Sequence, residues 1–198
     1  QGMVIRPALR GLNLVDGDAD SVLVEVAAGE PWDGVVEQTL ARGWPGLENL
    51  SLIPGLAGAA PYQNIGAYGV ELSDLLESVR ALGLDDGRSH IFSSSECRFT
   101  YRDSLFKSER PGEFLITSLR LRLPRQPAPV LEYGPLRQLA GRPATLETVR
   151  YVRELVCSLR RAKLPDPAEL PNAGSFFKNP VVDADHHARL RREWPPPP

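Results

Sequence analysis

The segment P-G-L-A-G-A-A-P-Y-Q-N-I-G-A-Y-G occupies residues 54–69, where four glycines punctuate the chain and four alanines keep the side chains small. A loop of this kind lets backbone N–H groups approach a ligand closely, which suits a pyrophosphate or a flat ring system. The alternative is a set of tight turns packed against a sheet. No Gly-Lys-Ser/Thr follows, so the segment is not a P-loop, and its glycine spacing differs from the dinucleotide-binding fingerprint.

Strands and helices mix on both sides of this segment. β-branched or alternating runs predict strands, and apolar residues at helical spacing predict helices. The predicted strands are residues 22–26, 79–84, 91–92 and 114–123, and the predicted helices are residues 31–43, 145–163 and 183–193. Because Asp85-Asp86-Gly87 marks a hairpin within this mixed order, the sequence predicts an α+β fold with antiparallel strands rather than a doubly wound parallel sheet.

Composition narrows the possible partners. The chain has 198 residues, 42% of them hydrophobic, and a net charge of -2, which is ordinary for a soluble globular protein. This charge favours neither nucleic acid nor a membrane as partner, and no apolar run approaches the roughly 20 residues of a membrane span. Cys97 and Cys157 lack metal-type spacing, which predicts a reducing, cytoplasmic location, and His90, His186 and His187 form no ligand pattern. No metal site is predicted.

Residues 97–107 are dense in polar and aromatic side chains without a clean period. Arg102 lies between Tyr101 and Asp103, so its guanidinium could be held by a carboxylate and packed on a ring. A fixed cation of this kind suits a carboxylate substrate or an enolate. The alternative is a structural ion pair.

Residues 160–179 hold a second polar tract. Ser175 lies in an Asn-Ala-Gly-Ser turn followed by Phe176 and Phe177, so its hydroxyl could donate a proton beside an apolar wall. It lacks a nucleophile elbow and an obvious histidine partner, which argues against a catalytic triad. The alternative is an ordinary turn serine. All three lysines of the chain, Lys107, Lys163 and Lys178, fall in these polar tracts.

Together and in this order, the motifs of the chain resemble the UDP-N-acetylenolpyruvoylglucosamine reductase family. They are P-G-L-E-N-L at residues 45–50, I-P-G at 53–55, Q-N-I-G-A-Y-G at 63–69, Y-R-D-S-L-F-K at 101–107, K-L-P-D-P at 163–167 and N-A-G-S-F-F-K-N-P at 172–180. The last tract makes the resemblance specific, because other flavoproteins of this fold share the glycine-rich turn but not this tract. Residues around Tyr133 resemble the tyrosine loop of the longer subtype.

The resemblance implies an FAD-binding α+β fold of the vanillyl-alcohol-oxidase type. Residues 1–164 would form the second FAD-binding subdomain, and residues 165–198 would begin a substrate-binding α+β domain. The family also opens with a subdomain carrying a Gly-Ser-Asn turn and ends near a catalytic glutamate. The Gly-Ser-Asn turn is not found in this sequence. The catalytic glutamate is not found either, since Glu193 does not lie in a matching context. We therefore expect a chain truncated at both ends and inactive by itself.

The resemblance further implies a reaction, site residues and a monomer. In the family, NADPH reduces FAD, and reduced flavin then reduces UDP-N-acetylglucosamine enolpyruvate to UDP-N-acetylmuramate for peptidoglycan. Arg102 matches the arginine that stabilises the enolate-like charge, and Ser175 matches the proton donor. The implied FAD-binding residues are Pro54, Gly55, Gln63, Asn64, Gly66, Ala67 and Tyr68, and the implied contacts to the UDP part are Tyr133, Arg160, Lys163 and Asn179.

Two other functions stay open at the level of sequence. One is an FAD-dependent oxidase of the same fold that acts on an alcohol, although the glycine-rich turn offers no histidine or cysteine for covalent flavin attachment. The other is a non-catalytic remnant that binds a UDP-sugar. Dependence on a nucleotide sugar rather than oxygen would separate the first from the reductase, and nucleotide-sugar binding without FAD would indicate the second.

Overall fold

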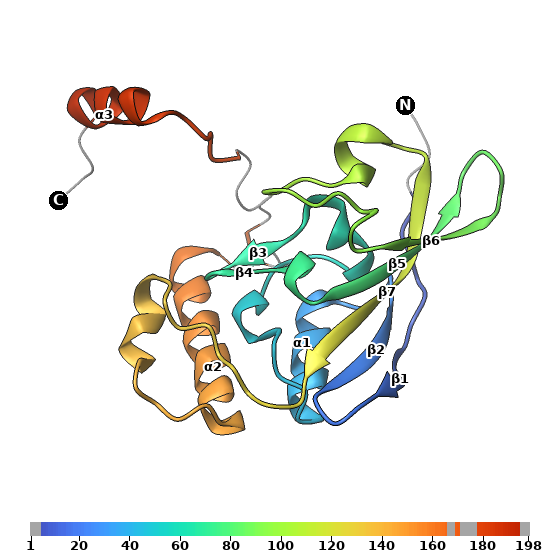
Figure 1. The fold of residues 1–198 in the computed structure, drawn as a ribbon, viewed down its shortest axis with the longest axis horizontal. Coiled ribbons are helices and arrows are strands. Elements are labelled where there is room, and N and C mark those ends of the chain that lie inside the picture. Colours follow the sequence, from blue (N-terminus) through green and yellow to red (C-terminus); the bar gives the residue numbers. More distant parts are fainter. Residues whose placement is uncertain (1–4, 166–168, 171–177, 195–198) are drawn as a thin grey trace. The chain divides into compact units, whose positions relative to one another are not determined.

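The computed structural model describes residues 5–165, 169–170 and 178–194 of the 198-residue chain (Figure 1). The chain forms two compact units, Gln1–Leu164 and Pro165–Pro198. The identities predicted for these two parts, a second FAD-binding subdomain and the beginning of a substrate-binding domain, remain predictions.

A five-stranded antiparallel sheet forms the centre of the first unit. Its strands, in spatial order, are β1 (Leu12–Gly17), β2 (Ser21–Ala27), β7 (Phe114–Pro124), β5 (Leu76–Gly83) and β6 (Ser89–Ser93). The predicted strands over 22–26 and 114–123 and the predicted hairpin around residues 85–87 are confirmed. β1 was not predicted, because nearly all of its side chains are exposed and its sequence therefore lacks a buried alternating face.

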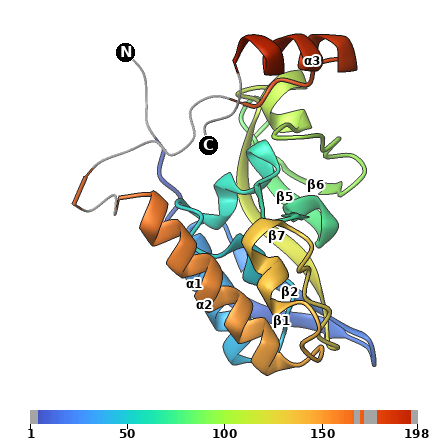
Figure 2. The same ribbon diagram turned by 90° about the vertical axis from the view of Figure 1, so that its left-hand side faces the viewer.

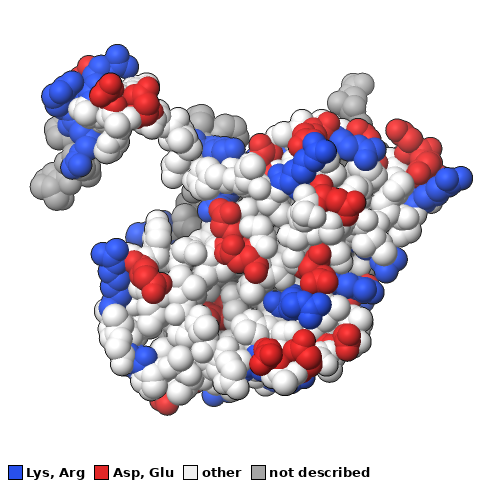
Figure 3. All heavy atoms as spheres, in the orientation of Figure 1, with Lys and Arg blue, Asp and Glu red and all other residues white. Residues whose placement is uncertain are grey.

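Leucines of β7 carry the core of the sheet. Leu119, Leu121 and Leu123 are fully buried, whereas Arg120 and Arg122 point to the other, wetter face, as the alternating pattern predicted. On that wetter face Arg120 pairs with Glu25 of β2. Over the first unit, Figure 3 shows acidic and basic side chains interspersed.

Two helices lie together on one side of the sheet (Figure 2). Helix α1 (Trp32–Ala41) buries Trp32 and ends before Gly43, whose φ of 76° gives a left-handed cap. Helix α2 (Leu146–Lys163) begins at Thr145, whose side chain accepts a hydrogen bond from Thr148 N. Both helices were predicted, since their apolar stripes are local features of the sequence.

Short turns connect α1 to β5, β6 to β7 and β7 to α2. They comprise the 3₁₀ turns Glu48–Leu50, Ala57–Ala59, Pro61–Gln63, Leu72–Asp74 and Gly134–Leu139, the hairpin of β3 (Gly66–Ala67) and β4 (Val70–Glu71), and the π-helical turn Leu105–Glu109 between β6 and β7. The glycine-rich segment serves packing at one position and remains open at another. A Cβ on Gly58 would lie 2.7 Å from the Ala28 side chain, whereas a Cβ on Gly55 would meet nothing within 4 Å.

The second unit contains the predicted third helix, α3 (Ala184–Glu193). Asp183 caps it by accepting a hydrogen bond from His186 N at 2.7 Å. None of the described helices in either unit is long and apolar enough to cross a membrane.

Candidate functional site

The β3–β4 hairpin organises the candidate site. Gly66 pairs with Glu71 and Ala67 with Val70, so only two residues, Tyr68 and Gly69, form the turn. Their φ angles of 50° and 86° are both positive, as in a type I′ turn. Tyrosine is unusual at the first turn position, because a left-handed backbone costs about 1 kcal/mol or more for a residue with a Cβ. The surrounding structure must therefore hold Tyr68 in place.

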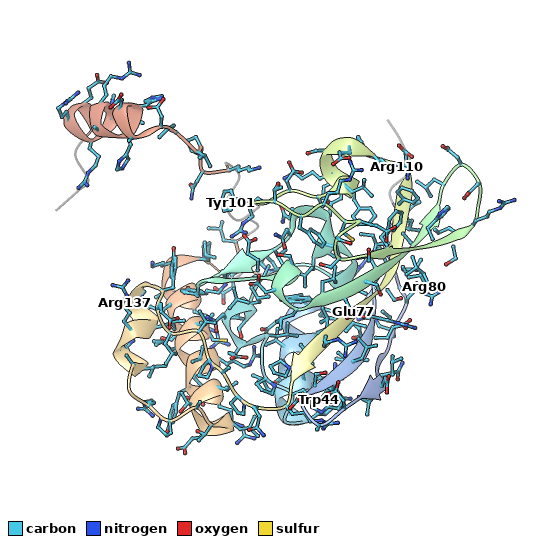
Figure 4. The ribbon with its side chains drawn as sticks, in the orientation of Figure 1. Trp44, Glu77, Arg80, Tyr101, Arg110 and Arg137 are labelled. Carbon is cyan, nitrogen blue, oxygen red and sulfur yellow. The ribbon has the colours of Figure 1, made fainter. Side chains whose placement is uncertain are left out.

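Arg102 lies against the strands of this hairpin. Its Nη1 donates to Glu71 Oε1 at 3.1 Å and to Asn64 O at 3.3 Å, and its Nη2 donates to Gly66 O at 2.5 Å. The guanidinium also lies 4.9 Å from the centroid of the Tyr101 ring, which Figure 4 labels. The side chain is 29% exposed. The structure thus places Arg102 as a fixed cation that is still open to a ligand.

The close approach of Arg102 requires a glycine at position 66. A Cβ there would lie 2.6 Å from Arg102 Nη1. The predicted cofactor residue Asn64 also supports this arrangement, because its buried amide donates to Glu71 Oε2 at 2.8 Å and accepts from Ser73 N at 3.0 Å. The side chain of Asn64 therefore orients the carboxylate that pairs with Arg102. A contact between Asn64 and a cofactor remains a prediction.

Glu71 is a site residue that sequence reasoning missed. The local motif suggested Asp103 as the neighbouring carboxylate, and Asp103 Oδ1 accepts hydrogen bonds from Ser104 N and Ser108 Oγ. Glu71 lies 31 positions before Arg102. Only the pairing of β3 with β4 brings this carboxylate opposite Gly66, and no short-range sequence signal encodes that pairing.

The turn of the hairpin meets the predicted tyrosine loop. The rings of Tyr68 and Tyr133 pack edge to face, with centroids 5.9 Å apart and planes at 87°. Tyr68 also packs against a small apolar cluster between α2 and the Gly134–Leu139 turn, formed by Leu136, Leu139, Val152 and Val156. Burial raises the pKa of the Tyr68 phenol, while the positive charge of Arg160 opposes that rise. A predicted FAD-binding residue and two predicted UDP-binding residues thus lie in one neighbourhood.

A network from α1 and α2 fixes the chain just before the Pro54-Gly55 turn. Leu52 has a φ of 54°; its N–H donates to Asp33 Oδ1 at 2.7 Å, and its carbonyl accepts from Arg160 Nε at 3.1 Å. Arg153 donates to both oxygens of Asp33, at 2.7 and 3.1 Å. Burial alone would raise the pKa of Asp33, but the hydrogen bonds from Arg153 and Leu52 lower it. Arg160 therefore holds the backbone as well as lying beside Tyr68.

Most of the remaining predicted site residues are exposed to solvent, and one lies outside the described residues. Pro54, Gly55 and Gln63 are exposed, and Lys163 is exposed at the last turn of α2. Asn179 is exposed in the second unit. Ser175 lies outside the described residues.

The glycine-rich turn has the backbone donors that a flavin cofactor would need. Within the part of the chain that the structure describes, the N–H groups of Gly55 and Leu56 have no protein acceptor. Because a Cβ at Gly55 would meet open space, an acceptor-rich group such as a pyrophosphate or a flavin edge can approach these donors. No group of three or more His, Cys, Asp or Glu side chains among the described residues is arranged to hold a metal ion.

Comparisons with known proteins agree with this geometry. Residues 1–93 match the model of the FAD binding domain family. The fold and the turn thus define an FAD-binding domain of the α+β class, as the sequence predicted.

Relatives identify the family more closely. UDP-N-acetylenolpyruvoylglucosamine reductase of Pseudomonas aeruginosa is 55% identical over 196 residues, which cover 98% of this chain and 58% of that protein. The reductase of Bordetella pertussis is 51% identical over 194 residues, covering 98% of this chain and 55% of the relative. The chain belongs to the UDP-N-acetylenolpyruvoylglucosamine reductase family and spans a little more than half the length of these relatives.

A solved structure is also similar. The crystal structure of UDP-N-acetylenolpyruvylglucosamine reductase from Thermus caldophilus has a TM-score of 0.57 and 26% identity to this chain. The match covers 85% of this chain and 53% of that one.

Proposed function

We propose that the whole protein that carries this chain reduces UDP-N-acetylglucosamine enolpyruvate to UDP-N-acetylmuramate, with NADPH as hydride donor and FAD as cofactor. One observation carries the proposal: a single short hairpin holds the Arg102 guanidinium on its strands and the Tyr68–Tyr133 pair at its turn. The names of the relatives support the same reaction.

FAD, when bound, supplies the hydride that it has received from NADPH. In the proposal, the exposed Pro54-Gly55 turn and Gln63 lie along the cofactor, and Gly66, Ala67 and Tyr68 continue that surface. The unpaired N–H groups of Gly55 and Leu56, within the described residues, would donate to its oxygens. Asn64 would contribute through the position it gives to Glu71.

Arg102 stabilises the negative charge that develops on the enolpyruvyl group. A guanidinium has five N–H donors, and three are used on Glu71, Asn64 and Gly66. Among the described partners this leaves two donors for the substrate carboxylate or the enolate oxygen. Because the three protein acceptors fix the cation beforehand, little reorganisation is needed when the charge forms. This is the physical difference between a site cation and a purely structural ion pair.

The other roles follow the resemblance. Ser175 donates the proton to the carbon that carries the enolate-like charge, next to the carbon that has accepted the hydride, and Tyr133, Arg160, Lys163 and Asn179 bind the UDP part. Arg160 uses Nε on Leu52 O, so its Nη groups are the ones proposed for the diphosphate. The protein is proposed to act as a monomer in the cytoplasm, where the buried free thiols of Cys97 and Cys157 would stay reduced.

The test uses the full-length gene product. We expect a purified flavoprotein that oxidises NADPH under anaerobic conditions only when UDP-N-acetylglucosamine enolpyruvate is added. Turnover of an alcohol with oxygen, independent of the nucleotide sugar, would replace the proposal with an oxidase. Calorimetric binding of the nucleotide sugar by a protein without FAD would indicate a non-catalytic remnant.

A further inference from the structure

Asn49 joins two segments of the candidate site that are far apart in sequence. Its side chain is buried, with 1% of the residue exposed, in the 3₁₀ turn Glu48–Leu50. Its amide Nδ2 donates to Tyr68 O at 2.8 Å and to Val130 O at 3.0 Å. Both N–H groups of one side chain are therefore used, one on the hairpin turn and one on the segment that leads to Tyr133.

Each of the two carbonyls belongs to a segment that carries one of the two paired tyrosines. Tyr68 adopts the left-handed backbone conformation of the turn, so a hydrogen bond to its carbonyl helps to hold the backbone that carries its ring. Val130 precedes Tyr133 by three residues, at the start of the tyrosine loop. Both hydrogen bonds are partly buried, and a carbonyl left there without a donor is costly, so removing the Asn49 amide would favour movement of both segments.

The packing between these segments is close. A Cβ on Gly69 would lie 3.3 Å from Val130 Cγ1 and 3.7 Å from Tyr133 Cβ. The turn and the loop therefore touch along Gly69, Val130 and Tyr133, in addition to the edge-to-face contact of the two rings. Tyr133 itself is 57% exposed, so its position depends on these few contacts rather than on deep burial.

We propose that Asn49 is a positioning residue that fixes the Tyr133 loop to the Tyr68 turn and so presets the Tyr133 ring for the nucleotide sugar. The inference rests on the proposed function and adds a specific cause for nucleotide-sugar affinity. A ligand that meets a preset ring loses less conformational freedom of the protein on binding. Asn49 does not touch the ligand and acts only through Tyr133.

The experiment is a double-mutant cycle in the full-length holoenzyme. Asn49→Leu keeps a similar volume and removes both donors. Thr39→Val is the matched control, because it removes another buried hydrogen bond, from Thr39 Oγ1 to Val36 O in α1, without touching either segment. Calorimetry measures the Kd of UDP-N-acetylglucosamine enolpyruvate, and the flavin absorbance checks that FAD is retained.

The inference predicts that Asn49→Leu weakens binding about tenfold, while Thr39→Val changes it less than about twofold. In a Tyr133→Ala background, Asn49→Leu should have no further effect. Equal Kd values for wild type and Asn49→Leu, or fully additive effects in the cycle, would overturn the inference. If Asn49→Leu does not fold, Asn49→Ser, which keeps one donor, should give a smaller loss of the same kind.

Hydrogen exchange separates this inference from the proposed function. Asn49→Leu should speed amide exchange in residues 130–134, whereas Thr39→Val should not. If wild type binds no nucleotide sugar, the proposed function fails, and the exchange result alone then decides whether Asn49 fixes the loop. Unchanged exchange in residues 130–134 would overturn the inference.

Discussion

Replacing Gly66 with alanine would displace the Arg102 guanidinium without removing any functional group. The added Cβ would lie 2.6 Å from Arg102 Nη1 and 3.1 Å from Val70 O. Non-bonded carbon atoms prefer separations of about 3.5–4.0 Å, so the flexible arginine must withdraw by about 1 Å. Its Nη1 bonds to Glu71 and Asn64, now 3.1 and 3.3 Å long, would then exceed hydrogen-bond length.

The consequences differ for stability and for rate. The lost bonds are partly exposed, so we expect the free energy of unfolding to fall by only about 1–2 kcal/mol. A misplacement of about 1 Å at a reacting group can cost about 100-fold in rate. Gly66→Ala should therefore lower kcat for nucleotide-sugar reduction by about 100-fold in a protein that still folds and holds FAD.

The assay follows NADPH oxidation by the full-length enzyme, together with thermal unfolding and flavin absorbance. Gly34→Ala in α1 is the control, because a Cβ there meets nothing closer than Pro31 Cβ at 3.9 Å. It should leave kcat unchanged. If folded, FAD-loaded Gly66→Ala keeps kcat within about threefold of wild type, the placement of Arg102 is not what limits the reaction.

Three further outcomes are expected. Glu71→Gln should lower turnover about tenfold and change the free energy of unfolding by less than about 1 kcal/mol. The control, Glu77→Gln, removes a 3.0 Å ion pair with Arg122 elsewhere in the molecule (Figure 4) and should leave turnover unchanged. Equal effects of the two variants in steady-state kinetics would contradict the role of Glu71. Burial raises the pKa of the Glu48 carboxyl, so the folded protein binds the proton of this carboxyl more tightly than the unfolded chain does. The stability that Glu48 contributes at low pH is therefore lost as the pH rises above about 4.5. Urea unfolding should thus show Glu48→Gln gaining stability over wild type with rising pH, and a constant difference would argue against a buried carboxyl. Burial also raises the pKa of Cys97 to about 12, so iodoacetamide at pH 8 should not label Cys97 in the folded protein, and rapid labelling in peptide mapping would contradict its burial.

Local signals allowed much of the fold to be predicted. The helices predicted over 31–43 and 145–163 and the strand predicted over 114–123 each depend on patterns of neighbouring residues, and the structure confirms all three elements. Strand β1 was not predicted, because nearly all of its side chains are exposed and it joins the sheet through backbone pairing with β2.

The contacts of the candidate site could not be predicted from the sequence as well as the fold, because they join residues far apart along the chain. The pairing of Glu71 with Arg102 depends on the hairpin register, and the double hydrogen bond of Asn49 reaches Val130 across 81 positions. The side chain of Asn64 bonds to Glu71, Thr100 and Ser73, and these contacts were not predicted; its contact with a cofactor remains a prediction. A motif shows which residues belong together, but not which of them holds another in place.

In the proposed enzyme, the β3–β4 hairpin brings the Arg102 guanidinium and the Tyr133 ring to one bound nucleotide sugar. A crystal structure of the full-length protein with FAD and UDP-N-acetylglucosamine enolpyruvate measures this directly. We predict Arg102 within about 3.2 Å of a substrate oxygen and Tyr133 against the same molecule. A substrate bound away from this hairpin, with neither side chain in contact, would contradict the proposed roles of Arg102 and Tyr133.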